Sequence, residues 1–526
     1  MIRDKILDSI EKAVKDLQKE KKFSLFDIPA VKIEYSESKA HGDYAAGIAM
    51  KIAKIVKKNP MEIADLLVSK IESYDSGLFE KIEAVKPGFI NFFVASGYLQ
   101  EQISKILKEK DKFGQLEIGK GKKVQVEFIS ANPTGPLTIG NARGGPFGDV
   151  LANVFKKAGF KTEKAYYIND YGMQILTLGH SVLKDEEAKY KGEYIDNLNK
   201  VVKEKDPYKA GEKAAEIILK GIKKTVEKLG IKFDEWVSEK SFHESGEVDK
   251  VIGFLKDKGL TYEKEGALWF KSSDYGDTRD RVLVKSDGEK TYLAGDIAHH
   301  KYKFEKKKFD KVINVWGADH HGDVPSLLAG VEALGYKGKL NTVLLQFITL
   351  FEGKKKLKMS KRAGTYVTMD ELLDEVGSDI VRFFFLQRSS DRHLNFDLSL
   401  AKEQSEKNPV YYVQYAYARM CSILRKSGKG VSDDFSLLKH KSELGLIKHL
   451  IRFPEVIEDV VVDYQVQRIP SYVVDLAKAF HSFYRDCRVL EEDEDLKKAR
   501  IALVLASKNV LKNSFDLIGV SAPERM

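Results

Sequence analysis

The sequence is poor in the features that mark secreted and membrane proteins. It contains 2 cysteines, Cys421 and Cys487, which lie far apart in a chain of 526 residues. Such a pair cannot supply a disulfide framework, and it fits thiols that a cytosol keeps reduced. No run of about eighteen apolar residues occurs. The segment from Met1 to Leu17 is charged and amphipathic, without the apolar block of a signal peptide. These absences predict a cytoplasmic protein that has no membrane partner.

The length and the net charge indicate the number of domains and the kind of partner. A chain of 526 residues is too long for a single hydrophobic core, and its 43% hydrophobic content is sufficient for folded domains. We therefore expect about two to four domains. The net charge of +9 favours a polyanionic partner, because Lys and Arg that neutralise phosphates release bound counterions. Charge alone leaves a basic protein without a nucleic acid partner equally open.

Residues 113–400 have the pattern of a Rossmann-like parallel sheet. The run 124–129 is strand-like, the apolar residues from Phe147 to Phe155 fall on one face of a helix, and 165–168 forms a following strand. Strand, helix and strand at these lengths predict a βαβ unit, with a site at the carboxyl ends of the strands. A second such half follows in the runs 312–316 and 343–348. Residues from about 183 to 290 break the rhythm and are expected to be an insertion.

The two ends of the chain differ from this central part. Residues 1–112 alternate helical stretches with short strand-like runs, which predicts a separate α+β domain. Residues 401–526 have helical patterns throughout and predict an all-α helical bundle. The predicted fold class is therefore α/β, with a Rossmann-like catalytic domain between an α+β domain and a helical domain.

Two distant loops are suited to phosphate. The first, SANPTGPLTIGNARGGPFGD at 130–149, leaves a strand and enters a helix, where free backbone N–H groups and the helix dipole favour anions. The second, KKKLKMSKRAGT at 354–365, carries cationic side chains on a small-residue loop and suits the charge of a nucleoside triphosphate under attack. A structural turn and a solvated lysine loop are the alternatives.

Together the two loops resemble the signature segments of class I aminoacyl-tRNA synthetases, and their flanking residues resemble arginyl-tRNA synthetases. Lys358-Met359-Ser360-Lys361 matches the KMSKS-type loop, and Thr138-Ile139-Gly140-Asn141 stands where the family has its HIGH tetrapeptide. The resemblance implies catalytic roles for Thr138, Gly140, Asn141, Lys358, Ser360 and Lys361. It implies ATP binding by Pro136, Gly140, Asn141, Gly317, Asp319, His320, Lys358, Met359 and Lys361.

The first tetrapeptide departs from the family, because Thr138 and Asn141 replace both histidines. A hydroxyl and an amide keep neutral hydrogen-bond donors but cannot become cationic. We therefore expect activity to survive with an altered pH dependence. An inactive, degenerate synthetase is the alternative.

Recognition of arginine needs carboxylates, which are the planar partners of a guanidinium. Glu127 interrupts an apolar strand, and Asp296 follows the run 290–295, where another strand is expected to end. An internal salt bridge with a lysine is the alternative for each carboxylate. The resemblance implies that Glu127, Tyr292 and Asp296 bind the guanidinium and that Ser130 and Asn132 bind the α-amino end. It also places Asn169 and Gln174 at the border of this pocket.

The histidine pairs 299–300 and 320–321 raise the question of a metal. Adjacent residues point to different sides and no cysteine lies near, so no four-ligand zinc set follows from the spacing. No protein-bound metal is expected, and Mg²⁺ should arrive with ATP, held mainly by the phosphates.

The resemblance implies an arginine–tRNA ligase whose substrates are ATP, L-arginine and tRNA(Arg). Residues 1–112 would then bind the D-loop corner of the tRNA and residues 401–526 the anticodon, in a monomeric enzyme. Three other readings stay open at this point. They are a class I synthetase for another amino acid, a different nucleotidyltransferase, and a tRNA-binding protein without catalysis.

Overall fold

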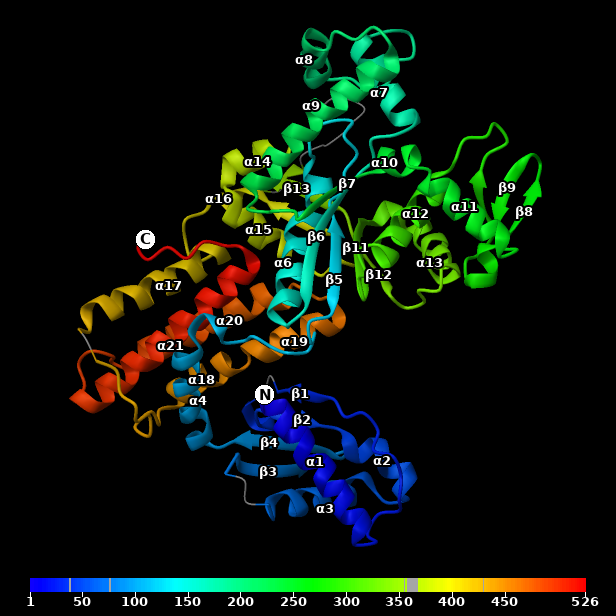
Figure 1. Ribbon diagram of the computed structural model, residues 1–526. Coiled ribbons are helices and arrows are strands. Elements are labelled where there is room, and N and C mark those ends of the chain that lie inside the picture. The colour runs from blue at the N-terminus through cyan, green and yellow to red at the C-terminus, as the bar shows by residue number, and fades with distance from the viewer. Residues whose placement is uncertain (37–38, 75–76, 354, 357–367, 429) are drawn as a thin grey trace.

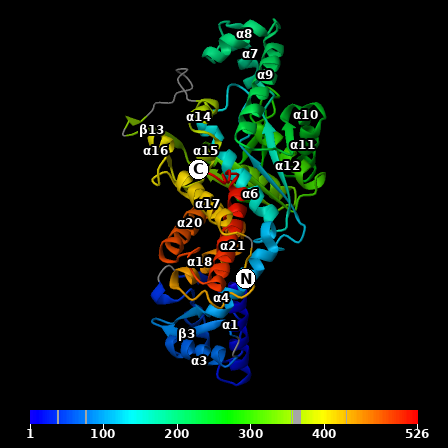
Figure 2. The same cartoon turned by 90° about the vertical axis from the view of Figure 1, so that its left-hand side faces the viewer.

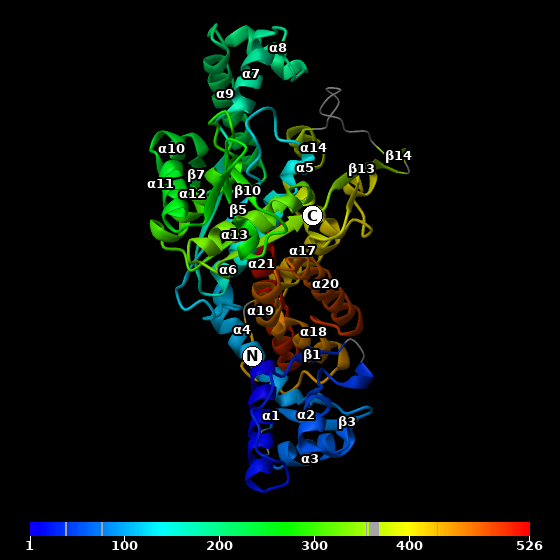
Figure 3. The same cartoon turned by 90° about the vertical axis from the view of Figure 1, so that its right-hand side faces the viewer.

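The computed structural model describes residues 1–36, 39–74, 77–353, 355–356, 368–428 and 430–526. A small domain at the N-terminus occupies one end of the molecule, and the helices α7 to α9 occupy the other (Figure 1). Views from the two sides show the C-terminal helices between the N-terminal domain and the central sheet (Figures 2 and 3). No helix in the described ranges is long and apolar enough to cross a membrane.

The N-terminal domain is a four-stranded antiparallel sheet of order β1-β2-β4-β3, covered by helices. Its first helix buries Ile2, Ile6 and Ile10 at intervals of one turn, which is the amphipathic spacing of a surface helix. The predicted α+β character is confirmed. The elements are α1 (Ile2–Lys19), β1 (Ile33–Tyr35), η1 (Lys39–His41), β2 (Tyr44–Ala46), α2 (Ile48–Val56), α3 (Pro60–Glu72), β3 (Phe79–Val85) and β4 (Phe89–Val94). Helix α4 (Ser96–Glu109) and η2 (Lys110–Lys112) lead to the central sheet.

Five parallel strands of order β12-β11-β5-β6-β7 form the central sheet. They are β5 (Lys123–Phe128), β6 (Lys161–Ile168), β7 (Glu235–Ser238), β11 (Lys311–Gly317) and β12 (Leu340–Leu345). The chain adds β6 and β7 on one side of β5 and then returns to add β11 and β12 on the other. The strand order therefore reverses between β5 and β11, which is where parallel sheets bind ligands.

Helices cover both faces of this sheet. Ile313 and Val315 of β11 belong to the same apolar core as α6 (Gly144–Lys157), whereas Val312 packs with side chains of α12 (Tyr292–Glu305) and α13 (Val324–Ala333). The predicted apolar stripe from Phe147 to Phe155 is buried on α6. The doubly covered parallel sheet confirms the predicted fold class.

One predicted strand is wrong. The run 290–295 was expected to end a strand before Asp296, but Tyr292 opens helix α12 and Asp296 lies in its early turns. Ala294, Ile297 and Ala298 are buried at a spacing of three and four residues. This helical period continues beyond the short window that resembled a strand and decides the conformation.

The segment predicted as an insertion contributes to the sheet as well as leaving it. It begins with α7 (Met173–Leu183), α8 (Glu193–Val201) and α9 (Pro207–Lys228) and returns through β7, the fifth strand of the sheet. Helices α7 and α9 approach so closely that a Cβ on Gly179 would lie 1.6 Å from the carbonyl oxygen of Pro207. After β7 come α10 (Glu239–Glu244), α11 (Glu247–Asp257), β8 (Thr261–Lys264), β9 (Ala267–Phe270), η3 (Ser272–Tyr275) and β10 (Arg281–Val284).

A smaller sheet and three helices follow the central sheet. Its order is β14-β13-β15, and the predicted capping box of Thr368 and Glu371 begins α14. The elements are β13 (Ile348–Glu352), β14 (Lys355–Lys356), α14 (Met369–Val376), α15 (Ser378–Leu386), β15 (Leu394–Asp397) and α16 (Leu398–Lys402). The C-terminal bundle contains α17 (Pro409–Lys426), α18 (Lys441–Ile451), α19 (Phe453–Asp463), α20 (Arg468–Asp486) and α21 (Glu494–Ile518), as predicted for an all-α region.

A buried arginine joins this bundle to the central sheet. Arg382 of α15 is fully buried and forms an ion pair with Asp149 of α6. It also donates to the carbonyl oxygens of Ile518 and Leu229, both at 2.8 Å. Helix α6 begins in the first of the two segments that were predicted to suit phosphate. The contacts of Arg382 therefore support both the end of α21 and the candidate site.

Candidate active site

The site lies where the strand order reverses, at the carboxyl ends of β5 and β11. The chain leaves β5 at Phe128 and reaches α5 (Ile139–Ala142) through residues 129–138, which we call the signature loop. On the neighbouring strand, β11 ends at Gly317 and continues into η4 (Ala318–Gly322). Two loops from adjacent parallel strands therefore border one crevice.

The signature loop begins with an unusual backbone conformation. Ile129 has φ 66° and Ser130 has φ 41°, a left-handed region in which a β-branched residue is strained. The surrounding contacts hold this conformation, because Ser130 Oγ accepts from the backbone N–H of Tyr167 at 3.1 Å and Tyr166 Oη donates to the carbonyl of Ala131 at 2.8 Å. The turn directs the next residues over the end of β6.

The residues that replace the two histidines lie at the start of α5. Thr138 is its N-cap and accepts from the backbone N–H of Asn141 at 3.4 Å. The Thr138 hydroxyl also donates to the Asn141 side-chain oxygen at 2.6 Å. Thr138 is buried, whereas Asn141 is exposed.

The signature loop is bonded to the residues that follow the lysine loop. Thr138 forms a β-bridge with Thr368, and the backbone N–H of Met369 donates to the carbonyl of Leu137 at 2.8 Å. The Arg143 guanidinium binds the carbonyls of Gln346, Ser389 and Arg392 on the other side. The candidate residues Lys358, Met359, Ser360 and Lys361 lie outside the described residues.

Glu127 is held in an internal salt bridge. Its carboxylate lies 2.7 Å from Nζ of Lys303, which is fully buried on α12. Lys303 lies 3.4 Å from the Asn314 side-chain oxygen, and the amide nitrogen of Asn314 lies 3.0 Å from His300 Nε2. The alternative that the sequence left open for this carboxylate, a lysine partner, is therefore the arrangement in the structure.

Two further carboxylates, Glu239 and Asp296, form no ion pair with a lysine or arginine among the residues that the structure describes. The partner of Glu239 is the imidazole of His243, whose Nε2 lies 3.9 Å from Glu239 Oε1. Glu239, the first residue of α10, follows β7 directly, is buried and has one oxygen without a hydrogen-bond partner. Asp296 follows Gly295 on α12 and lies near enough to Glu239 to be affected by its charge. A Cβ at Gly295 would lie 3.3 Å from Glu239 Oε1 and 3.9 Å from Tyr167 Oη. The absent side chain leaves space beside the Glu239 carboxylate and the Tyr167 hydroxyl.

Burial disfavours the ionised forms of both carboxylates. The pKa of Asp296 is raised well above its ordinary value by burial and by the nearby charges of Glu239 and Glu127. Burial also raises the pKa of Glu239. Two carboxylates with raised pKa values in one crevice favour a cationic ligand that would let both ionise.

Further polar atoms at this place lack partners. The hydroxyl of Tyr167 and the side-chain oxygen of Asn169 are buried without a hydrogen bond, and burial raises the pKa of Tyr167 well above its ordinary value. Gln174 donates to the carbonyl of Asn169 at 2.7 Å, so these two predicted residues lie together. Buried polar groups are normally paired, so these atoms indicate where a polar ligand binds.

The other candidate residues lie around the mouth of the crevice. Tyr292 is 57% exposed at the start of α12, and Asn132 is exposed on the signature loop. Asp319 and His320 lie in η4. The centre of the His320 ring lies 5.7 Å from the centre of the Trp316 ring. His320 also pairs with Asp323 at 3.1 Å. The sequence prediction thus gathered residues from three strand ends at one edge of the sheet.

Known proteins match the whole chain. Three family models match in order: the arginyl tRNA synthetase N terminal domain over residues 2–94, the class I (R) tRNA synthetase catalytic domain over 102–239 and 184–383, and the DALR anticodon binding domain over 413–526. An arginine–tRNA ligase of Caldanaerobacter subterraneus subsp. tengcongensis is 46% identical over 100% of this chain and 99% of its own. The chain belongs to the arginyl-tRNA synthetase family.

Other relatives agree with this membership. The arginine–tRNA ligase of Bacillus subtilis is 43% identical over 95% of each chain. The fold matches the arginyl-tRNA synthetase of Thermus thermophilus with a TM-score of 0.81 at 22% identity, over 100% of both chains. The synthetase is therefore an ATP-dependent aminoacyl-tRNA ligase that joins arginine to tRNA(Arg).

Glu239 lies at this edge of the sheet and was not among the residues predicted from the sequence. It lies within the segment 183–290, which was predicted to leave the sheet. The signal that could have found it is the run Glu235-Trp236-Val237, whose aromatic and β-branched residues favour a strand. A carboxylate immediately after such a strand would then have been placed at the same edge as the signature loop.

The histidine pairs do not form a metal centre in the part of the synthetase that the structure describes. No group of three or more His, Cys, Asp and Glu side chains there could hold a metal ion. Burial, followed by the charge of Lys303, lowers the pKa of both His299 and His300 well below the ordinary value. These imidazoles are neutral and serve the packing around Glu127. The prediction of no protein-bound metal stays a prediction.

Proposed function

We propose that Glu239 and Asp296 together bind the guanidinium of the substrate arginine. The observation that carries this proposal is that neither Glu239 nor Asp296 forms an ion pair with a lysine or arginine in the described ranges, and that one buried oxygen of Glu239 lacks a hydrogen-bond partner. Gly295, the neighbour of Asp296, leaves space next to Glu239. A planar guanidinium can donate to both carboxylates from one plane. Tyr292 stands at the entrance to this space, and Glu127 contributes negative charge behind it while bound to Lys303.

The remaining predicted residues would bind the other parts of arginine and ATP. Ser130 and Asn132 would hold the α-amino end of arginine at the carboxyl end of β5, and Asn169 and Gln174 would border the same pocket after β6. Thr138, Gly140 and Asn141, with Pro136, would hold ATP at the start of α5, and Gly317, Asp319 and His320 would border the adenosine. Lys358, Met359, Ser360 and Lys361 would act on the phosphates, as the family resemblance implies. Mg²⁺ would bind the phosphates of ATP as part of that substrate.

The reaction then proceeds in two steps. The arginine carboxylate attacks the α-phosphorus of ATP, the bond to the β-phosphate oxygen breaks, and pyrophosphate leaves. A hydroxyl of the terminal ribose of the tRNA next attacks the arginyl carbonyl, and AMP leaves. The protein contributes orientation of the reacting groups and neutral or cationic donors toward the charge on the phosphate.

The outer domains would bind the tRNA. Residues 1–112 are proposed to contact its D-loop corner and residues 401–526 its anticodon, with the catalytic domain at 113–400. We also propose a cytoplasmic monomer of 59.5 kDa, which sedimentation of the purified chain would test. The boundaries and the insertion at about 183–290 stay predictions.

Aminoacylation with labelled arginine and purified tRNA(Arg) tests the assignment of substrates. We expect ATP-dependent charging with arginine and no charging with lysine or glutamate, because only a guanidinium matches the carboxylate pair. Equal charging with another amino acid would contradict the proposed pocket. A chain that binds tRNA without consuming ATP would contradict catalysis.

Removing the Asn141 side chain should slow adenylate formation. If its amide donates to the α-phosphate, we expect Asn141→Ala to lower the rate of activation by about 10- to 100-fold, somewhat below the loss of a full oxyanion donor. The KM for arginine should stay unchanged, since this side chain lies outside the carboxylate pocket. Thr138→Ser, which keeps a hydroxyl at the N-cap, is the control and should stay close to wild type. Unchanged turnover in Asn141→Ala and Thr138→Ala would refute the role given to these side chains.

Arginine binding should strengthen as the pH rises. The guanidinium binds ionised carboxylates. The pKa values of Asp296 and Glu239 are raised, so each carboxyl group ionises at a higher pH than an ordinary Asp or Glu. A raised folded-state pKa also means that these groups stabilise the arginine-free fold at low pH and lose that contribution as pH rises through the folded pKa.

The thermal shift produced by arginine measures this effect. We expect the shift to increase between about pH 5 and pH 8 and to flatten in Asp296→Asn. A shift that decreases over the same range would show that ionisation of the pair is not coupled to arginine binding.

A further inference from the structure

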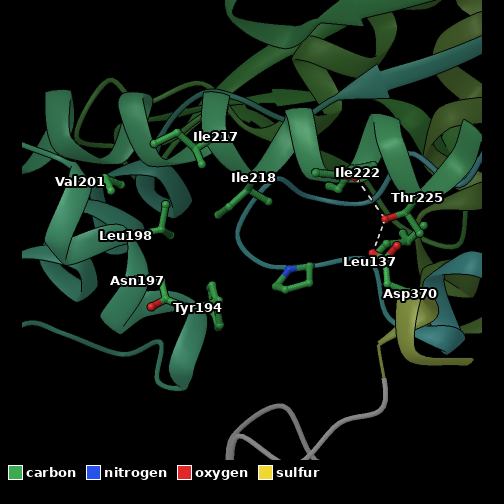
Figure 4. A pocket seen from close by; sticks show the side chains of 12 residues that line it. Leu137, Tyr194, Asn197, Leu198, Val201, Ile217, Ile218, Ile222, Thr225 and Asp370 are labelled. Atoms are coloured by element: carbon green, nitrogen blue, oxygen red, sulfur yellow. Dashed lines mark hydrogen bonds between the residues drawn. The ribbon is translucent and has the colours of Figure 1, made fainter. Parts of the chain in front are cut away.

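A cavity of about 670 Å³ lies at the amino ends of β5 and β6, the edge of the central sheet opposite to the candidate active site. A strand of six residues such as β5 spans roughly 17–20 Å, so the two places are separate. A smaller cavity, which Figure 4 shows between α8, α9 and the signature loop, is lined by Pro136 and adjoins the proposed ATP site. None of the residues assigned above to arginine or ATP lines the larger cavity.

Lysines from four segments line this larger cavity. They come from the start of β5, the end of α6, the start of β6 and the residues that follow α12, and they are Lys123, Lys156, Lys161, Lys306 and Lys307. Lys307 lies 3.0 Å from Glu163 and 3.1 Å from Glu235, whereas the other four form no ion pair with a carboxylate within the described ranges. The cavity therefore carries a local excess of positive charge.

The register of the sheet places two of these lysines side by side. Lys123 of β5 and Lys161 of β6 are direct partners in the parallel ladder, and like charges at paired positions destabilise a sheet. Lys123 Nζ donates to the carbonyl of Lys307 at 3.2 Å, which brings no negative charge. Lys156 and Lys306 lie at the C-terminal ends of α6 and α12, where the helix dipole favours a cation. That explanation does not apply to a pair at the starts of two strands.

The uncharged side chains of the cavity suit a small ligand. Thr162 lines it, and the Thr162 hydroxyl is buried without a hydrogen-bond partner in the part of the chain that the structure describes. Buried hydroxyls are normally paired, so a donor is available there to an acceptor on a ligand. Phe160 and Phe309 add two aromatic side chains. The volume is in the range of small-molecule sites.

We propose that this cavity binds a compact polyphosphate group, either free or carried by a nucleoside. Several negative charges on adjacent phosphoryl groups would compensate the four lysines together, and lysine binds phosphate as a point charge. A nucleic acid strand brings only one charge with each nucleotide, and a single carboxylate would leave most of the lysines uncompensated. The proposal is independent of the proposed arginine and tRNA sites.

Calorimetric titration of the full chain with inorganic triphosphate tests this inference. An unreactive analogue of arginyl-adenylate is present throughout, so that triphosphate is not drawn to the proposed ATP site. The cavity variant, Lys161→Gln with Lys306→Gln, should bind triphosphate about tenfold more weakly, the effect of losing two exposed ion pairs. The control variant, Lys122→Gln with Lys308→Gln, removes the same charge from neighbouring lysines that do not line the cavity and should change the affinity less than about twofold. All four lysines are exposed, so both variants should fold.

A second titration, with GTP, distinguishes the two sources of the polyphosphate. Tighter binding of GTP than of triphosphate, reduced by Phe160→Leu, would assign the site to a nucleotide whose base contacts the aromatic side chain. Equal or weaker binding of GTP would assign it to free polyphosphate, and both results agree with the inference.

Three results would overturn the inference. They are no binding of triphosphate to the wild-type chain, equal affinities of the cavity and control variants, and binding of sulfate as tight as that of triphosphate. The rate of tRNA charging at saturating substrates should be unchanged in the cavity variant, because its lysines lie at the edge opposite to the candidate active site. Weaker tRNA binding in the cavity variant, with triphosphate binding unchanged, would show instead that this surface contacts nucleic acid.

Discussion

Asp296→Asn should raise the KM for arginine by about a hundredfold or more, because loss of one partner of a buried charge pair costs about 2–5 kcal/mol. The substrate guanidinium would then face Glu239 alone, with an amide in place of the second carboxylate. Glu239→Gln should have an effect of similar size. The KM for ATP should stay close to wild type in both variants, since neither side chain lies on the signature loop. Steady-state aminoacylation with each substrate varied in turn measures these values.

Two further variants distinguish specific recognition of the guanidinium from a general effect of negative charge near the site. Glu235→Gln changes a carboxylate at the start of β7, the strand that precedes Glu239, where it pairs with Lys307 at 3.1 Å, and should leave the KM for arginine unchanged. Gly295→Ala should raise it, because the added Cβ would lie 3.3 Å from Glu239 Oε1 in the space for the guanidinium. If Glu127→Gln raises the KM while Asp296→Asn and Glu239→Gln do not, arginine binds at Glu127 instead.

Arg382→Met should lower the free energy of unfolding by about 3–5 kcal/mol, the cost of removing one partner from a buried ion pair. The substitution leaves the carbonyls of Ile518 and Leu229 without their donor. Asp149 keeps one partner, because Lys164 lies 2.6 Å from its other oxygen, which places the loss toward the lower end of the range. Chemical denaturation followed by tryptophan fluorescence reports on it, since Trp236, Trp269 and Trp316 all lie in the central part of the chain.

An exposed arginine provides the matched control. Arg388→Met removes the same charge two residues beyond the end of α15, where the side chain is exposed, and should change the stability by less than about 0.5 kcal/mol. Gly519→Ala tests the contact of Arg382 with the end of α21 by changing α21 instead of the arginine. A Cβ there would lie 2.4 Å from the Arg382 guanidinium, and the residue has φ 65°. Equal stability of Arg382→Met and Arg388→Met would mean that the buried pair does not hold the end of α21 to α6.

Local patterns were sufficient for much of the fold. The apolar stripe on α6, the continuous apolar strand β11 and the capping box at Thr368 were all predicted from spacings within one helix or strand. The failure at 290–295 arose from the same source, because a short window alternated like a strand while the buried positions of α12 repeat with a helical period. Strand β7 was missed since four residues carry too little pattern within a Lys/Glu-rich segment.

The sequence by itself determined the family, the order of the domains' patterns and the set of residues near the strand ends, because motif residues and periodicity are local. Only the tertiary structure decided which carboxylate is available for a cation. Lys303, separated from Glu127 by 176 positions, neutralises it, whereas in the described ranges neither Glu239 nor Asp296 forms an ion pair with a lysine. The physical reason is that charge compensation depends on distances of a few ångströms in space, and those distances exist only after distant segments have packed together.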